Sequence, residues 1–165
     1  MQVSIYICQD DQYEENDTRA TATPLPEQTW ITARQADNDF FVIDVTSGYE
    51  RVLVDCRFTH AQGDIDIELQ NSSGTVICSS GSTDDNEYID CCVPGPGTYY
   101  IRVHYDNECN AYQLWWDDVS GCCDDQYEEN DTRATATPLP EQTWITARQA
   151  DNDFFVIDVT SGYER

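Results

Sequence analysis

The segment Asp64-Ile-Asp-Ile-Glu-Leu69 alternates acidic and aliphatic residues without interruption. Because successive side chains of a β-strand point to opposite faces, this pattern places Ile65, Ile67 and Leu69 on one face and three carboxylates on the other. In the segment 98–104, alternation places Tyr99, Ile101 and Val103 on one face and Tyr100, Arg102 and His104 on the other. Both segments are therefore predicted to be strands with one buried face and one face in water.

The rest of residues 10–119 has the same character. Strands are predicted at 29–33, 39–45, 51–58, 64–69, 75–79, 87–91, 98–104 and 112–116. Turn-forming sequences separate them, among them Asn71-Ser-Ser-Gly74 and Pro94-Gly-Pro-Gly97. No segment sustains the period of a helix. Eight short strands at this spacing predict an all-β fold, a jelly roll or other β-sandwich.

One block of sequence occurs twice, because residues 124–165 repeat residues 10–51 letter for letter. Repetition at about the length of one domain is the signature of an array. The two strands predicted in the second copy cannot close a sandwich, so we expect another chain or missing sequence to complete it. The expected regions are an N-terminal strand or linker at 1–9, a complete β-sandwich repeat at 10–119, a Cys-Cys junction at 120–123 and a partial second repeat at 124–165.

The composition excludes several classes of function. The chain has 165 residues and a formal net charge of −24, from 32 acidic and 8 basic residues. So acidic a surface repels nucleic acid and anionic membranes, and no stretch has the length and apolar character for membrane insertion. The motifs of serine hydrolases, zinc peptidases, phosphate-binding loops and dinucleotide-binding enzymes are missing. We expect a protein that is not an enzyme and binds no nucleic acid.

The cysteines indicate an extracellular or cell-surface location. The sequence has no C-x-x-C motif and only two histidines, so disulfides are favoured over a zinc site. Disulfides persist in an oxidising compartment, which favours a location outside the cytoplasm. One repeat, residues 10–123, contains seven cysteines, so one thiol stays free or bridges to another repeat. The adjacent pair at 122 and 123 is the natural candidate for that bridge. We expect disulfides to involve Cys8, Cys56, Cys78, Cys91, Cys92, Cys109, Cys122 and Cys123.

A group of oxygen-bearing side chains suggests a calcium site. Carboxylate and amide oxygens from two loops suit a cation that takes six to eight oxygen ligands. The alternative is a solvated acidic cap, since Asp and Asn are ordinary turn residues. The candidate ligands are Glu14, Asn16, Asp17, Asp37 and Asp39, repeated in the second copy as Glu128, Asn130, Asp131, Asp151 and Asp153.

Two further sets of residues are candidates for surface chemistry. Asn-x-Ser/Thr sequences predict glycosylation at Asn71, which lies on a predicted turn, and at Asn16 and Asn130. A glycan on Asn16 would compete with its role as a calcium ligand. Aromatic residues could form a platform for a polymer ligand, but core and cross-strand packing is the favoured interpretation. These aromatic residues are Trp30, Tyr99, Tyr100, Tyr112, Trp115 and Trp116.

Five motifs in order resemble a known family. They are Tyr13-Glu-Glu-Asn-Asp-Thr18, Asp37-Asn-Asp-Phe-Phe41, Asp64-Ile-Asp-Ile-Glu-Leu69, Gly97-Thr-Tyr-Tyr-Ile-Arg-Val103 and Tyr112-Gln-Leu114. Together they resemble the bacterial pre-peptidase C-terminal domain, which is related to clostridial collagen-binding modules. The resemblance implies a non-catalytic jelly-roll sandwich appended to secreted enzymes or surface proteins. In the collagen-binding relatives the Glu/Asn/Asp run is where calcium binds. The high cysteine content and the repeat depart from the usual pattern of the family.

These observations predict a structural repeat unit of an extracellular filament or a long surface adhesin. Copies of the chain would be its partners, joined end to end by strand complementation and disulfides. The alternative is a calcium-dependent, non-catalytic binding module of a secreted enzyme, with an extracellular protein or polysaccharide as ligand.

Overall fold

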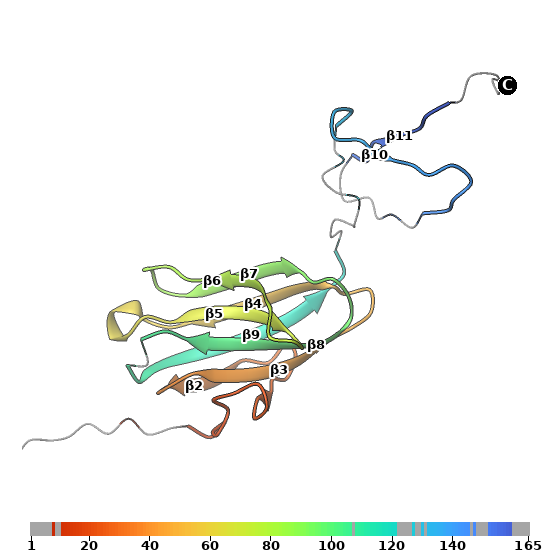
Figure 1. Cartoon of the computed structure of the whole chain (residues 1–165). Coiled ribbons are helices and arrows are strands. Elements are labelled where there is room, and N and C mark those ends of the chain that lie inside the picture. Colours follow the sequence, from red (N-terminus) through yellow and green to blue (C-terminus); the bar gives the residue numbers. More distant parts are fainter. Residues whose placement is uncertain are drawn as a thin grey trace, which may run out of the picture. The chain divides into compact units, whose positions relative to one another are not determined.

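The computed structural model describes residue 8, residues 11–106 and 108–121, residues 127 and 130, and residues 132–145, 147 and 152–159. Over these residues the regular secondary structure is almost entirely β (Figure 1). It divides into two units, Met1–Ser120 and Gly121–Arg165. The strand expected near the N-terminus lies outside the described residues, except for Cys8. No helix in the described part of the chain is long and apolar enough to cross a membrane.

The strands of the first unit follow the predicted ones closely. A single short 3-10 helix, η1 at His60–Gln62, interrupts them in the described residues. The strands are β1 (Thr23–Pro24), β2 (Ile31–Gln35), β3 (Asp39–Val45), β4 (Arg51–Arg57), β5 (Asp66–Asn71), β6 (Val76–Ser80), β7 (Glu87–Cys92), β8 (Gly97–His104) and β9 (Asn110–Val119).

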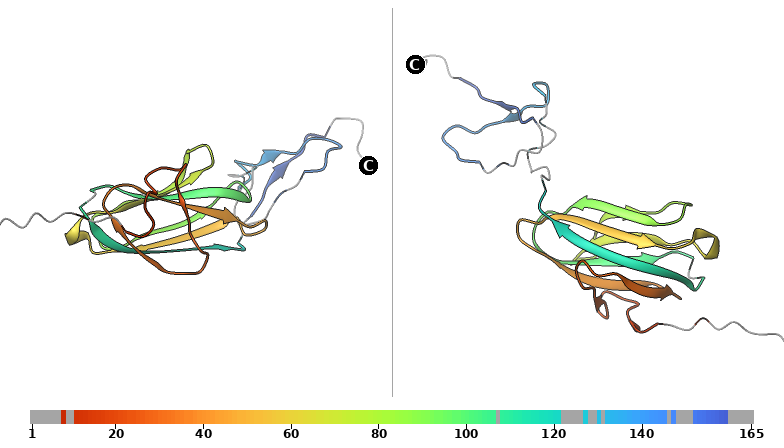
Figure 2. Two further views of the ribbon diagram at one scale, coloured as in Figure 1. Left: turned by 90° about the horizontal axis from the view of Figure 1, so that it is seen from below. Right: turned by 180° about the vertical axis from the view of Figure 1, so that it is seen from behind.

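These strands form two sheets that pack face to face (Figures 1 and 2). One sheet has the order β1-β3-β8-β5-β6 and the other has the order β2-β9-β4-β7. Apart from the parallel pair β1–β3, the pairings within both sheets are antiparallel. Buried aliphatic and aromatic side chains of both sheets form one core. The prediction of an all-β sandwich is confirmed.

The alternating segments lie where the sequence predicts. Ile65, Ile67 and Leu69 have no exposed surface. In β8, Ile101 and Val103 are likewise fully buried, while the residues between them are only partly buried. Since β8 lies between β3 and β5, its apolar face lies in the middle of the core.

Strands β1, β2 and β9 differ from the prediction because tertiary contacts define them, and β5 begins and ends two residues later than expected. Strand β1 contains a proline and has only two residues, so no periodicity reveals it. Strand β2 lies two residues later than expected and follows its pairing with β9. Strand β9 extends beyond Trp116 to Val119 because its pairing with β4 continues as far as Arg51. The buried Asp118 accepts a hydrogen bond from the backbone N–H of Thr46 at 2.5 Å.

The hairpin between β5 and β6 also contacts the repeated sequence. The side-chain oxygen of Asn71 accepts hydrogen bonds from the backbone N–H groups of Ser73 and Thr75. Gly74 follows with φ +86°, and a Cβ there would lie 2.5 Å from the guanidinium carbon of Arg19. Arg19 in turn donates to the Ser72 carbonyl at 3.0 Å. The predicted turn is confirmed, and the positive φ explains why glycine suits its last position.

The second unit contains a two-stranded sheet made of β10 (Thr137–Pro138) and β11 (Phe155–Val156). Thr137 pairs with Phe155 in the register that Thr23 and Phe41 have in the first unit. Of the two strands expected in the second copy, the described residues form only this part of the second. The described residues in the positions of β2 are not a strand.

Candidate metal centre

The loop that carries Glu14, Asn16 and Asp17 is fixed at several points. The carboxylate of Asp11 accepts hydrogen bonds from the backbone N–H groups of Tyr13, at 2.8 Å, and Arg34, at 2.5 Å. The ring of Tyr13 packs edge-on against Phe41, with 5.9 Å between centroids. The Phe40 N–H donates to the Asn16 carbonyl at 2.8 Å. The loop is therefore attached to the start of β3.

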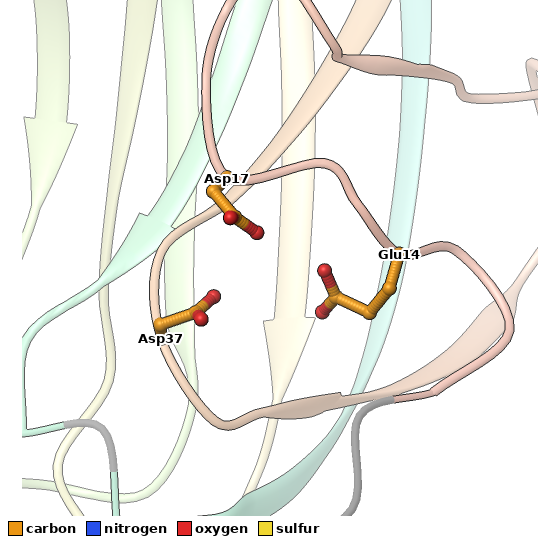
Figure 3. A group of neighbouring side chains, drawn as sticks. All are labelled: Glu14, Asp17 and Asp37. Atoms are coloured by element: carbon orange, nitrogen blue, oxygen red, sulfur yellow. The ribbon is translucent and has the colours of Figure 1, made fainter.

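Three carboxylates meet at this attachment. Ligand atoms of Glu14, Asp17 and Asp37 all lie within 4.8 Å of one another. In Figure 3 the three carboxylates point into the same space, two from the loop and one from the segment that leads into β3. Like charges this close repel one another unless a proton or a cation neutralises them.

Asn16 and Asp39 border this cluster and are both 1% exposed. One carboxylate oxygen of Asp39, Oδ2, accepts a hydrogen bond from the Tyr112 hydroxyl at 2.5 Å. The other oxygen, Oδ1, is buried and makes no hydrogen bond, and the same is true of the side-chain oxygen of Asn16. Glu14 Oε1 and Asp17 Oδ1 are also buried without a hydrogen bond. Buried oxygens in native proteins are normally satisfied, so this concentration requires an explanation.

Burial also changes the acidity of the site. It raises the pKa of Glu14 to about 7, and the neighbouring Asp17 and Asp37 add to the effect. It raises the pKa of Asp39 to about 8, against the hydrogen bond from Tyr112, which acts in the opposite direction. A bound cation would reverse these shifts by favouring the charged carboxylates.

The donor set fits calcium, which the resemblance to collagen-binding modules implies. The unsatisfied oxygens belong to carboxylates and one amide, the hard ligands that Ca²⁺ prefers. The structure brings three of the five predicted ligands together and places Asn16 and Asp39 beside them. Glu14, Asn16, Asp17, Asp37 and Asp39 would hold the ion.

The described part of the second copy repeats this arrangement. Asn130 is 1% exposed, and its carbonyl accepts a hydrogen bond from the Phe154 N–H at 2.9 Å, as Asn16 does from Phe40. Asp153 has a buried carboxylate oxygen without a hydrogen bond, as Asp39 does. The other predicted ligands of this copy, Glu128, Asp131 and Asp151, lie outside the described residues.

Part of the first unit matches a known family. Residues 37–104 match the model of the bacterial pre-peptidase C-terminal domain. Among solved structures, the fold is similar to the pre-peptidase C-terminal domain of a collagenase from Bacillus anthracis. The TM-score is 0.51 and the sequence identity is 19%, over 58% of this chain and 94% of that one. No curated protein matches the sequence. The match includes Asp37 and Asp39 but not the loop at residues 14–17.

A second acidic cluster was not predicted. Ligand atoms of Glu27, Asp117 and Asp118 also lie within 4.8 Å of one another. Burial raises the pKa of Glu27, with further contributions from the two aspartates. Two of its carboxylates accept hydrogen bonds, since Gln28 Nε2 donates to Asp117 and the Thr46 N–H to Asp118. No local pattern predicts this cluster, because Glu27 lies 90 positions before Asp117 in the sequence.

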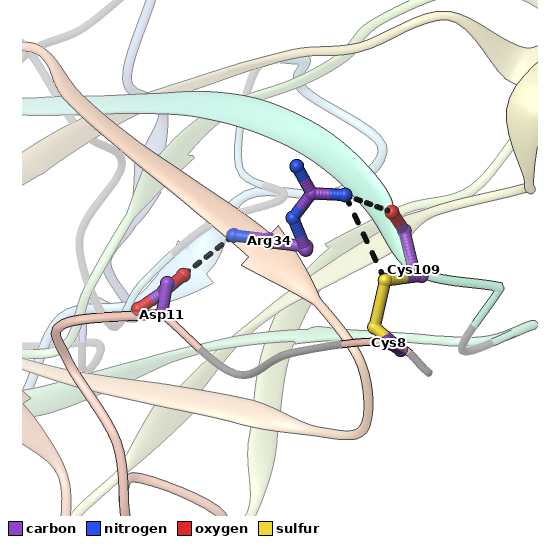
Figure 4. The surroundings of a disulfide bond; sticks show 4 residues. All are labelled: Cys8, Asp11, Arg34 and Cys109. Carbon is purple, nitrogen blue, oxygen red and sulfur yellow. Dashed lines mark hydrogen bonds between the residues drawn. A yellow bond between two sulfur atoms is a disulfide. The ribbon is translucent and has the colours of Figure 1, made fainter. Parts of the chain in front are cut away.

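Disulfides between described cysteines brace the first unit, in agreement with an oxidising location. Cys8 bonds Cys109, beside Arg34, which donates to the Cys109 carbonyl (Figure 4). Cys78 bonds Cys91, and Cys92 is disulfide-bonded as well.

The expectation of a disulfide at Cys56 is wrong. Cys56 is a free thiol, fully buried in the core, where desolvation raises its pKa strongly. An odd number of cysteines per repeat predicts that one thiol stays free or bridges to another repeat, and Cys56 is such a free thiol. The junction cysteines, Cys122 and Cys123, lie outside the described residues.

The three predicted glycosylation sites differ in how far their side chains are buried. Asn16 and Asn130 are almost fully buried, so the folded chain presents neither amide for glycan attachment. Asn71 lies on the partly exposed hairpin turn, and glycosylation there stays a prediction.

Most of the aromatic residues pack rather than form a platform. Tyr99, Tyr112 and Trp116 belong to the core. Trp30 is 39% exposed and stacks on Trp115, with 6.1 Å between the centroids.

Proposed function

We propose that the chain is a structural repeat unit of an extracellular filament or long surface adhesin, with calcium bracing each unit. The observation that carries this proposal is the identical block, because the described part of its second copy repeats two local features of the first. Both copies have the same parallel strand register, and both have an edge-on Tyr–Phe pair at 5.9 Å. A block that folds alike in two places is suited to forming the same joint repeatedly.

Calcium contributes rigidity in this role. The candidate ligands join the loop at residues 14–17 to the start of β3, close to the Cys8–Cys109 disulfide. Removing the cation would leave several buried carboxylates in mutual repulsion.

Negative-stain electron microscopy of the native protein, with calcium and with a chelator, tests this proposal. We expect filaments with an axial repeat of one unit, and shorter or frayed filaments after chelation. Compact particles of uniform size in both conditions would contradict it.

The family match supports a second candidate, a calcium-dependent and non-catalytic binding module of a secreted enzyme. Residues 37–104 match a family whose members are attached to secreted proteins, and the similar solved domain comes from a collagenase. Saturable, chelator-sensitive sedimentation of the chain with insoluble collagen or cellulose would support this function. No sedimentation with either polymer would count against it.

A further inference from the structure

A short stretch of chain joins the Cys8–Cys109 disulfide to the candidate metal centre. Cys8 lies three residues before Asp11, and Asp11 lies three residues before Glu14, the first candidate calcium ligand. The disulfide has a sequence separation of 101, so it attaches the start of this stretch to a distant part of the first unit. The attachments of Cys8 and Asp11 therefore limit where the loop at residues 14–17 can lie.

Cys109 is itself held at the end of β2. Its backbone N–H donates to the Gln35 carbonyl at 2.9 Å, and its own carbonyl accepts a hydrogen bond from Arg34 Nη1 at 3.2 Å. Its φ is +68°, a conformation that a residue other than glycine keeps only where its surroundings hold it. Cys109 is thus a fixed point beside the segment that leads from β2 to Asp37.

Asp11 is the second attachment of the same stretch. Its Oδ1 accepts a hydrogen bond from the Tyr13 N–H at 2.8 Å, and its Oδ2 accepts one from the Arg34 N–H at 2.5 Å. Arg34 therefore contacts both Asp11 and Cys109, as Figure 4 shows. Because both oxygens of Asp11 accept from backbone N–H groups, this carboxylate fixes the backbone that enters the loop.

We propose that the Cys8–Cys109 disulfide and Asp11 form an anchor that positions the calcium-binding loop, so that calcium affinity depends on whether this disulfide is intact. The proposal rests on the calcium-braced unit of the proposed function and names residues that set its affinity. The anchor acts by holding the loop at residues 14–17 close to Asp37 before the cation binds.

The anchor matters because the ligands repel one another. The carboxylates of Glu14, Asp17 and Asp37 lie together without a cation, at a cost in electrostatic free energy. When the anchor is broken, calcium must also order the loop, and the entropy lost on ordering lowers the affinity. Residues that orient the ligands of a metal site typically change its affinity by about 10–100-fold. The hydrogen bond from Phe40 to Asn16 remains, so we expect the lower end of this range, about tenfold.

The coupling acts in both directions, because linkage between two equilibria is reciprocal. If the intact disulfide raises calcium affinity about tenfold, saturating calcium stabilises the disulfide about tenfold against reduction. The reductant is a small dithiol, which attacks the disulfide by thiol–disulfide exchange. Two electrons and the two thiol protons of the dithiol pass to Cys8 and Cys109, and the dithiol closes to a cyclic disulfide.

The Cys78–Cys91 disulfide is an internal control in the same molecule. It joins β6 to β7, and β6 lies at the opposite edge of its sheet from β1 and β3. Calcium at the candidate metal centre should therefore change its reduction only through the general stability of the fold.

The first experiment is a redox titration of the wild-type chain in mixtures of reduced and oxidised dithiothreitol, with saturating calcium or with a chelator. Alkylation and mass spectrometry report each disulfide separately. We expect the ratio of reduced to oxidised dithiol at half-reduction of Cys8–Cys109 to rise about tenfold more with calcium than the ratio for Cys78–Cys91. No shift at Cys8–Cys109, or an equal shift of both bonds, would overturn the proposal.

The second experiment measures calcium affinity by isothermal titration calorimetry. The variant Cys8→Ser/Cys109→Ser removes the bond without leaving a lone thiol, and Cys78→Ser/Cys91→Ser is the matched control. We expect the first variant to raise the Kd for calcium about tenfold and the control to keep the wild-type value. Asp11→Ala should also raise the Kd, and the two changes should not add fully, because they act on one stretch of chain. Equal affinities of the two double variants, or a wild-type affinity of Asp11→Ala, would overturn the proposal.

Failure of the anchor can be distinguished from failure of the proposed function. A wild-type chain that binds no calcium would contradict both. Calcium binding that is equally strong without the Cys8–Cys109 bond would contradict the anchor and leave the calcium-braced unit intact. The expected loss of affinity, together with filaments that are the same with calcium and with a chelator, would support the anchor and contradict the bracing role of calcium.

Discussion

Calcium binding at the candidate metal centre should release protons and weaken at acidic pH. The pKa of Glu14 is raised to about 7 and that of Asp39 to about 8 in the chain without metal. Both groups must ionise to bind the cation as carboxylates, so protons compete with calcium. At pH 7 Glu14 is about half protonated and Asp39 about nine-tenths protonated, which gives about 1.4 protons released per calcium.

The same values determine the change in affinity. At pH 9 both groups are almost fully ionised, whereas at pH 6 about one molecule in 10 has an ionised Glu14 and about one in 100 an ionised Asp39. The apparent dissociation constant should therefore rise about a thousand-fold from pH 9 to pH 6, if both carboxylates must ionise.

Isothermal titration calorimetry measures both quantities. Titrations at pH 7 in two buffers with different ionisation enthalpies give the number of protons released per calcium, and titrations from pH 6 to pH 9 give the affinity. The Asp39→Asn variant should release about 0.5 protons at pH 7, because only Glu14 then titrates. An affinity independent of pH, or no proton release by the wild-type chain at pH 7, would refute the reasoning.

Three further predictions concern stability and reactivity. In a chelator the melting temperature should fall from pH 5 to pH 9. The pKa of Asp39 is raised to about 8 in the folded chain, so its contribution to stability is fully present below the pKa that it has in the unfolded chain and is lost as the pH rises through about 8. A melting temperature that rises over this range would count against a buried, protonated Asp39. Cys109→Ser removes the Cys8–Cys109 bond, whose partners are 101 residues apart, and should lower the free energy of unfolding by about 2–5 kcal/mol. Cys78→Ser should lower it by less, because the Cys78–Cys91 bond joins residues only 13 apart and so constrains the unfolded chain less. Denaturant titration measures both values, and a larger effect of Cys78→Ser would contradict the loop-length argument. Cys56 should resist alkylation by iodoacetamide in the folded chain and react in denaturant, as measured by mass spectrometry, whereas rapid modification of the folded chain would contradict its burial.

The strands with regular alternation could be predicted from the sequence because burial alone decides them. The structure places β3 at Asp39–Val45, the predicted bounds, and buries Ile65, Ile67 and Leu69 as the alternation requires. A strand with one face in the core must expose every second residue, and this local signal is strong. The short parallel pairing of β1 with β3 has no such signal, because it joins segments that lie apart in the sequence.

The candidate site could be predicted in part for the same reason. Glu14, Asn16 and Asp17 form one recognisable run, and the structure brings two of them to Asp37. The cluster of Glu27 with Asp117 and Asp118 depends on the packing of β9 beside the start of β2, which no local pattern reports. The pairing of Cys8 with Cys109 and the free thiol of Cys56 likewise follow from three-dimensional distance.

The most direct test of a repeat unit that joins its own copies is a cryo-electron microscopy reconstruction of the native filament. The account predicts filaments whose density repeats along the axis once per unit, with the two-sheet sandwich of the first unit in every repeat. Filaments built from an unrelated fold, or a native protein that forms no filaments, would contradict it.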